Sequence, residues 1–118
     1  MKKKSSPKIM KKRGVKRKSI ITLSRKNIRT TESLGNGFFR HRFAPVVVDA
    51  NSLTTIRLVA PGGRMAISGG WEKSLEPYLR PFMVVSSYPF SRSEWYLQIE
   101  NPTGVGRLLI GYLITKFP

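Results

Sequence analysis

The stretch Glu94-Trp95-Tyr96-Leu97-Gln98-Ile99-Glu100 decides the fold class of this chain. Trp95, Leu97 and Ile99 alternate with Glu94, Tyr96, Gln98 and Glu100, which is the two-residue period of a β-strand. The pattern predicts a strand over these residues, with the Trp, Leu and Ile side chains in a core and the opposite face in water.

Further strands are predicted on both sides of this stretch. Asn101-Pro102-Thr103-Gly104 turns the chain, and Arg107 to Thr115 returns as a strand, so the two segments form a predicted hairpin. The other predicted strands are Val46 to Val48, Ser52 to Val59, Arg64 to Ser68 after the turn Pro61-Gly62-Gly63, and Phe82 to Ser87. Short strands at a spacing of about 8 to 12 residues, without a helical period, predict an all-β antiparallel sandwich, jelly roll or small barrel.

The N-terminal quarter of the chain differs from the rest in charge. Residues 1–31 hold thirteen Lys and Arg and no Asp or Glu, whereas residues 32–118 hold nine cations against six anions. The few apolar side chains in residues 1–31 are not enough to offset the entropy of ordering and the charge repulsion. We therefore predict a disordered arm over 1–31, a junction over 32–44 with a flexible Gly35-Asn36-Gly37, and an antiparallel β domain over 45–118.

A polycationic arm requires a polyanionic partner. Lys and Arg side chains that neutralise phosphates release counterions, which favours binding to nucleic acid of any sequence. No zinc-ligand spacing, basic zipper or aromatic RNA-binding signature is present to read bases. The predicted nucleic-acid-binding residues are Lys2, Lys3, Lys4, Lys8, Lys11, Lys12, Arg13, Lys16, Arg17, Lys18, Arg25, Lys26 and Arg29.

Other roles for the arm stay open at this point. It could bind an acidic protein surface or act as a targeting peptide. It could also lace between subunits, with Ile20, Ile21, Leu23 and Ile28 adding a strand to a neighbour's sheet. The segment Phe38 to Phe43 mixes aromatic and cationic residues and could stack bases, but we expect it to anchor the arm to the core, with His41 as an ordinary junction residue.

The last predicted strand is apolar on both faces. A body of about 85 residues is too small to cover two full apolar layers, so one face is expected to meet another subunit. The predicted assembly residues are Leu108, Leu109, Ile110, Tyr112, Leu113 and Ile114.

Several function classes find no support in the sequence. The chain has no cysteine, so disulfides and thiolate metal sites are excluded. Its six carboxylates are scattered, and no Ser, His and Asp share a recognisable context, so we expect no enzyme activity, cofactor, metal or small-molecule substrate. The longest apolar run, Leu108 to Ile114, is far shorter than the roughly 20 residues of a membrane helix, so no membrane partner is expected. Trp71 follows two glycines and is expected to pack on the sheet.

Short motifs from Val59 to Phe117 resemble a small β-module of bacterial secreted proteins and phage fibre or appendage proteins. The matching motifs are Ala60-Pro61-Gly62-Gly63, Ser68-Gly69-Gly70-Trp71, Ser86-Ser87-Tyr88-Pro89, Trp95-Tyr96-Leu97-Gln98-Ile99-Glu100-Asn101 and Gly111-Tyr112-Leu113-Ile114-Thr115. Ala60 and Thr115 stand where that module has its two cysteines, so the stabilising cross-link is missing here. The resemblance implies a non-enzymatic structural β-domain of the kind displayed in virions.

The sequence thus predicts a virion structural protein: a phage capsid, minor capsid or capsid-associated protein, assembled in the host cytoplasm and located in the virion. Its expected partners are copies of itself or other virion proteins, with the arm on nucleic acid or an acidic shell surface. The alternative is a cellular nucleic-acid-binding protein, such as a ribosomal or nucleoid component. Such proteins usually spread cations over the folded body, so the location of the charge separates the two.

Overall fold

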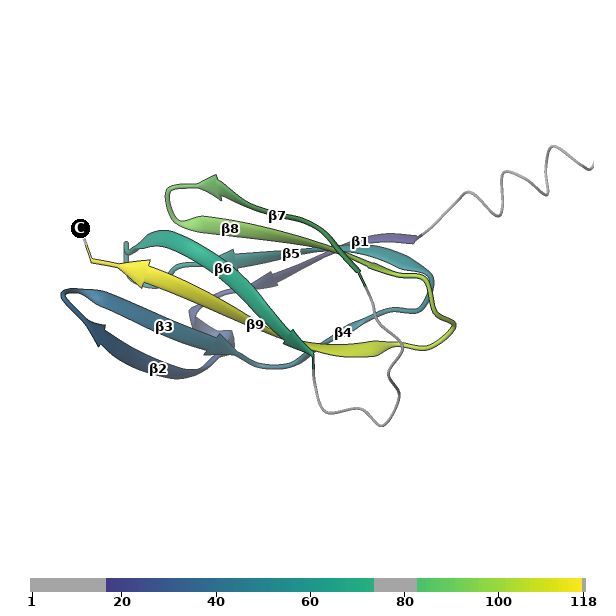
Figure 1. Cartoon of the computed structure of the whole chain (residues 1–118), viewed down its shortest axis with the longest axis horizontal. Coiled ribbons are helices and arrows are strands. Elements are labelled where there is room, and N and C mark those ends of the chain that lie inside the picture. The colour runs from purple at the N-terminus through teal and green to yellow at the C-terminus, as the bar shows by residue number, and fades with distance from the viewer. Residues whose placement is uncertain (1–16, 74–82, 118) are drawn as a thin grey trace, which may run out of the picture.

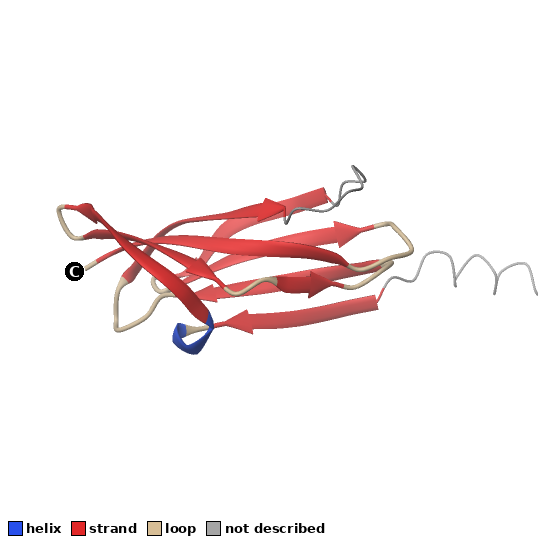
Figure 2. Ribbon diagram, turned by 90° about the horizontal axis from the view of Figure 1, so that it is seen from below, coloured by secondary structure: helices blue, strands red, loops and turns tan. Residues whose placement is uncertain are grey.

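The computed structural model describes residues 17–73 and 83–117, and these ranges form a sandwich of two β-sheets with one short 3-10 helix (Figures 1 and 2). The elements are β1 (Arg17–Leu23), η1 (Arg25–Asn27), β2 (Ile28–Gly35), β3 (Phe38–Phe43), β4 (Val46–Val48), β5 (Ser52–Val59), β6 (Met65–Lys73), β7 (Met83–Ser91), β8 (Glu94–Asn101) and β9 (Arg107–Lys116). The predicted all-β sandwich is confirmed.

Sheet A has the strand order β1-β5-β8-β7. β5 and β8 are antiparallel along their whole length, with Ser52 opposite Asn101 and Val59 opposite Glu94. β7 and β8 form a hairpin, whereas β1 pairs with β5 in parallel. The sheet therefore contains one parallel pair at an edge of an otherwise antiparallel arrangement.

Sheet B is built around β9. β6 pairs with β9 on one side, and β3 and β4 pair with it on the other. β2 continues the sheet beyond β3 as an edge strand. The two hairpins β2–β3 and β7–β8 point toward the same end of the molecule as the C-terminus (Figure 1).

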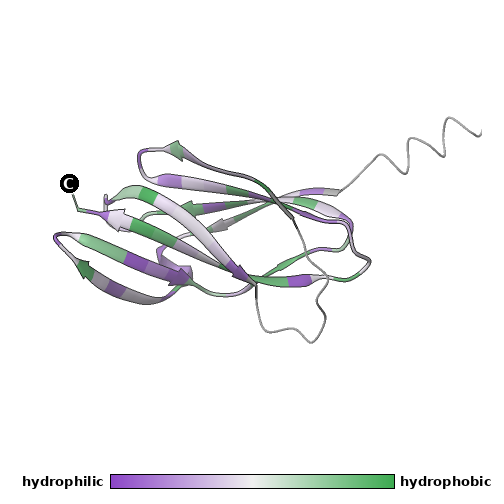
Figure 3. Ribbon diagram, viewed as in Figure 1, coloured by the Kyte–Doolittle hydropathy of each residue, from purple (hydrophilic) through white to green (hydrophobic). Residues whose placement is uncertain are grey.

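The core lies between the sheets, where alternate residues of the long strands meet. Ile56 and Leu58 of β5, Leu97 of β8, and Leu109 and Leu113 of β9 are fully buried. Figure 3 shows this alternation as hydrophobic and hydrophilic bands along the strands. The predicted strand over 52–59 and the predicted inward face of the segment 94–100 are confirmed.

The predicted arm and junction are wrong for residues 17–43, which are part of the sandwich. Leu23 is 3% exposed, and Ile21 and Ile28 pack against the same core. The backbone of β1 is paired with β5, and the hydroxyls of Ser19 and Thr54 are 3.0 Å apart. Burial of these apolar side chains and pairing of the backbone outweigh the local charge repulsion. Residues 1–16 lie outside the described residues.

The predicted flexible junction at residues 35–37 is instead a tight hairpin turn. Gly35, Asn36 and Gly37 have φ values of 89°, 55° and 83°, and β2 and β3 pair directly on either side. Positive φ is accessible to glycine and tolerated by asparagine, so this sequence fits the turn that it makes.

The predicted hairpin between 94–100 and 107–115 is also wrong. β8 belongs to sheet A and β9 to sheet B, so the segment between them crosses from one sheet to the other. Asn101 holds the crossing: its Nδ2 donates to the carbonyls of Val48, Asp49 and Val105 at 2.9 to 3.1 Å. Its Oδ1 accepts from the backbone N–H and the hydroxyl of Thr103. Turn residues alone do not distinguish such a crossing from a hairpin.

Candidate nucleic-acid interface

The predicted nucleic-acid-binding residues divide between two parts of the chain. The eight from Lys2 to Lys16 lie outside the described residues. Of the other five, Arg17 and Lys18 lie in β1, Arg25 and Lys26 in η1, and Arg29 in β2. The side chains of Lys18, Arg25, Lys26 and Arg29 are exposed. These cations therefore belong to the surface of the folded domain.

Three arginines from separate elements line a surface depression of about 330 Å³, which we call the arginine pocket. They are Arg25 of η1, Arg29 of β2 and Arg64 of the loop between β5 and β6. Uncharged groups complete its lining: Ile28, Thr30, Thr31, His41 and Pro61. Among the residues that the structure describes, no carboxylate lines the pocket and none of the three arginines forms an ion pair.

Local hydrogen bonds and a β-bulge set the backbone positions of Arg25 and Arg29. η1 is held by a hydrogen bond from the Ser24 backbone N–H to Asn27 Oδ1 at 2.9 Å and by Ala44 N–H donating to the Asn27 carbonyl. Arg29 is the extra residue of a β-bulge, because Ile28 and Thr30 oppose consecutive residues of β3. Bulges commonly redirect a side chain at a sheet edge.

Arg64 is the most constrained of the three. Its backbone N–H donates to the Pro61 carbonyl across the turn at 3.1 Å. Its guanidinium carbon lies 4.8 Å from the ring centroid of Phe39 and 4.4 Å from that of Phe117. The two rings meet edge to face, and the guanidinium packs on both of them. Arg64 Nε is buried and makes no hydrogen bond, while the side chain as a whole stays half-buried.

His41 forms the buried floor of the pocket. It is 1% exposed, so its predicted role as an ordinary junction residue is wrong. Its Nδ1 lies 2.9 Å from the Thr31 hydroxyl and its Nε2 2.8 Å from the Thr115 hydroxyl, so a neutral ring satisfies both hydroxyls. Burial, and then the nearby charge of Arg64, hold the pKa of His41 below its ordinary value of 6.5.

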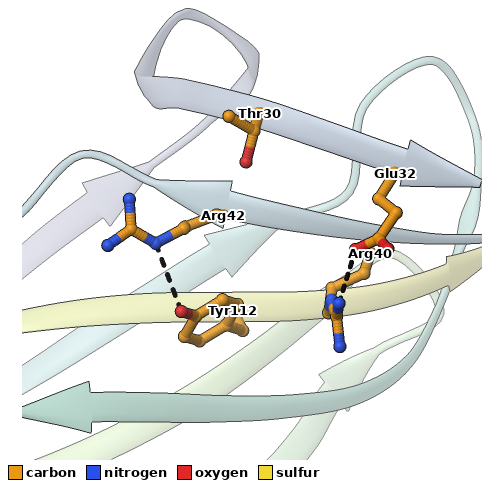
Figure 4. A pocket seen from close by; sticks show the side chains of 5 residues that line it. All are labelled: Thr30, Glu32, Arg40, Arg42 and Tyr112. Atoms are coloured by element: carbon orange, nitrogen blue, oxygen red, sulfur yellow. Dashed lines mark hydrogen bonds and ion pairs between the residues drawn. The ribbon is translucent and has the colours of Figure 1, made fainter.

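A neighbouring depression on the outer face of sheet B has a different electrostatic character. Figure 4 shows Arg40 paired with Glu32 and Arg42 donating its Nε–H to the Tyr112 hydroxyl at 3.2 Å. Tyr112 in turn donates to Glu72, which lies 4.0 Å from Arg42. Glu32 and Glu72 lie close to its two arginines and offset their charge, so this depression is less suited to binding an anion than the arginine pocket.

The charge of the described residues is strongly positive. They hold thirteen Lys and Arg, because eight of the chain's 22 lie in residues 1–16 and Arg80 also lies outside the described residues. They hold five of the chain's six carboxylates, because Glu76 lies outside them as well.

Sequence reasoning missed Arg64 and His41 as members of this surface. The available signal was the turn Pro61-Gly62-Gly63, which places a cation directly after it.

The predicted assembly residues do not share one surface. Leu109 and Leu113 are fully buried in the chain's own core and Ile110 is nearly so, so the prediction that they contact another subunit is wrong. Leu109 and Leu113 belong to the hydrophobic core between the sheets, so they are buried without a second subunit. Leu108 remains 38% exposed opposite Val47, which is 51% exposed, while Tyr112 and Ile114 are half-buried.

Other predicted features can be placed as well. Trp71 is 43% exposed, so it is covered only in part by the sheet. Within residues 17–73 and 83–117, no group of three or more His, Asp or Glu side chains is arranged to hold a metal ion. In the same ranges no helix is long and apolar enough to cross a membrane.

A protein-family model, described as YjdH, matches residues 18–115 of the chain. The chain belongs to the YjdH family. The match starts within β1 and ends within β9, so the YjdH region coincides with the sandwich, β1 and β2 included. Searches of curated proteins and of solved structures gave no match.

Proposed function

We propose that this protein is a non-enzymatic structural protein of a virus particle whose basic surface binds nucleic acid without reading its sequence. The binding surface begins in residues 1–16 and continues over Lys18, Arg25, Lys26 and Arg29. The folded domain carries the protein's contacts with neighbouring copies or other virion proteins.

The observation that carries the nucleic-acid part is the unbalanced charge of an otherwise ordered surface. The exposed cations of β1, η1 and β2 have a single carboxylate close by in the sequence, Glu32, and that carboxylate is engaged by Arg40. Like charges held together on a fold raise its free energy, and a polyanion relieves that repulsion. Each phosphate so neutralised also releases counterions.

The nucleic-acid part is tested by fluorescence anisotropy with duplex and single-stranded oligonucleotides over a range of salt. A truncated chain starting at Glu32 is unsuitable, because it lacks β1. The full chain is instead compared with a variant in which Lys2, Lys3, Lys4 and Lys8 are replaced by Gln. We expect a salt slope shallower by about 0.9 per lost contact on duplex DNA, or about 0.7 on single strands. An unchanged slope and affinity would defeat the role of these residues.

The assembly part is supported by apolar side chains that the fold leaves exposed at one end of sheet B. Val47 and Leu108 are opposite each other, and Val105 in the preceding loop is 53% exposed. Sedimentation at micromolar concentration tests this part. We expect oligomers for the natural chain and a shift toward monomer for Leu108→Ser. A chain that is monomeric at every concentration would count against assembly through this surface.

A second candidate is a cellular nucleic-acid-binding protein, and one observation favours it. Residues 17–31 belong to the body, so the folded part carries cations over several elements rather than being nearly neutral. That distribution is expected of ribosomal or nucleoid proteins. Preferential binding to folded RNA by a monomeric protein would support this candidate over a virion role.

A further inference from the structure

We propose that Arg25, Arg29 and Arg64 form a discrete binding site for one phosphate group. The inference deepens the proposed function by placing a phosphate in a particular pocket. Its test with small phosphates does not depend on the source of the phosphate.

Charge and chemistry select an oxyanion as the occupant. The arginine pocket gathers cations from three separate elements, and no carboxylate of residues 17–73 or 83–117 lines it to balance them. Guanidinium groups present N–H donors in a planar fork that matches the oxygens of a phosphate. Thr30 and Thr31, which line the same pocket, are uncharged and so add no negative charge to it.

The constraints on the pocket argue for a site rather than a diffuse basic patch. Arg64 lies against Phe39 and Phe117, and the turn at Pro61 fixes its backbone. Arg29 is held at a bulge, and η1 positions Arg25 through the Ser24 to Asn27 hydrogen bond. The Arg64 side chain and the backbone at Arg25 and Arg29 are thus ordered before binding, which lowers the entropy lost on binding, so a single phosphate can be held without a long polymer.

His41 provides a direct readout of occupancy. It is the only histidine in the chain, and its buried ring lines the pocket. The charge of Arg64 is one of the two causes that lower the pKa of His41, and Arg25 and Arg29 line the same pocket. A bound phosphate would oppose that positive potential and raise the pKa of His41.

The experiment follows the His41 ring resonances of the full chain by NMR during titration with inorganic phosphate at constant ionic strength. We expect a saturable shift and a higher pKa for His41, with no saturable change on adding chloride. Arg29→Gln and Arg25→Gln, both at exposed positions, should each weaken phosphate binding about tenfold, because a hydrogen bond to a charged group is lost. Arg40→Gln is the matched control, since Arg40 is paired with Glu32 outside the pocket, and it should bind phosphate as the natural chain does.

Two further titrations identify the source of the phosphate. A dinucleotide with one internal phosphodiester tests a nucleic-acid backbone, and a sugar phosphate tests a phosphomonoester. A saturable His41 shift without oligonucleotide binding would leave the site standing and sink the proposed function. Oligonucleotide binding without any saturable His41 shift, or equal phosphate affinity in Arg29→Gln, Arg25→Gln and the natural chain, would overturn the site and leave the proposed function intact.

Discussion

Gly69 of β6 lies against the indole of Trp95 on the facing sheet, and this contact predicts a large effect of a one-carbon change. A Cβ added at Gly69 would lie 2.1 Å from Trp95 Cδ1 and 2.6 Å from both Cγ and Nε1. Real Cβ contacts are never that short, so Gly69→Ala forces either the indole or the strand to move. Movement of the indole would also break the hydrogen bond from its Nε1–H to Ser87 Oγ at 2.9 Å.

The expected cost of Gly69→Ala combines two terms. Overpacking a core position costs about 1 to 3 kcal/mol, and the lost hydrogen bond about 0.5 to 1.5 kcal/mol. Alanine in place of glycine in a strand stabilises the fold by roughly 0.5 to 1 kcal/mol, because less backbone entropy is lost on folding. We expect a net loss of about 2 to 3 kcal/mol in the free energy of unfolding, which is a fall in Tm of roughly 10 to 20 °C for a domain of this size.

The next residue of the same strand supplies a matched control. A Cβ at Gly70 meets no atom within 4 Å, so Gly70→Ala should leave stability unchanged or raise it slightly. Urea unfolding measures both variants, and Trp95→Ala supplies a background in which the clash is gone. In that background Gly69→Ala should be nearly neutral. Equal effects of Gly69→Ala and Gly70→Ala, or full additivity of Gly69→Ala with Trp95→Ala, would refute the predicted contact.

Three further predictions concern other described residues. Asn101→Ala should destabilise by about 3 kcal/mol in urea unfolding, because it leaves buried carbonyls without donors, whereas Gln98→Ala on the outer face of β8 should change little. The pKa of folded His41 lies below 6.5, so the unfolded chain takes up this proton first as pH falls. The stabilisation that comes from the lowered pKa of His41 is thus complete above about pH 7.5 and is lost as pH falls through 6.5 toward the folded pKa. Thermal unfolding at several pH values should show this loss, and His41→Gln should make the Tm depend less on pH. A double-mutant cycle of Arg57 and Glu94 should give a small favourable coupling that weakens with added salt, since the Arg57 side chain is 34% exposed to water.

The strands with clear two-residue alternation were predictable from sequence. In the segment 94–100, Trp95, Leu97 and Ile99 alternate with Glu94, Tyr96, Gln98 and Glu100, and the structure buries Leu97 and Ile99 on the predicted inward face. The segment 52–59 alternates less regularly, but it too is a strand with every second residue buried. Pairing partners were not predictable in the same way. Asn101 sends β9 to the other sheet through contacts with Val48 and Asp49, about 50 positions earlier in the chain, which no local turn pattern encodes.

The N-terminal strands were missed because charge dominated the interpretation of residues 17–31. Ser19, Ile21 and Leu23 do alternate with outward-facing residues, but three inward positions are too few to indicate a strand by themselves. Their role is seen only when β5 is known to pair with this segment. The arginine pocket was missed for a related reason. Arg25, Arg29 and Arg64 come from separate segments, and only the arrangement of η1, the bulge and the loop after β5 brings them together.

The position of β9 has a consequence for how the protein is made. β9 is the strand that joins β3, β4 and β6, yet it leaves the ribosome after the other eight described strands. His41 meets Thr115, 74 positions later, after roughly 4 to 15 seconds of further synthesis at usual translation rates. During that interval the β2–β3 hairpin and β6 lack their common partner and present unpaired backbone to other chains. Sheet B therefore closes only after β9 has emerged, and we expect a chain stalled before Arg107 to expose the unpaired edges of β3 and β6.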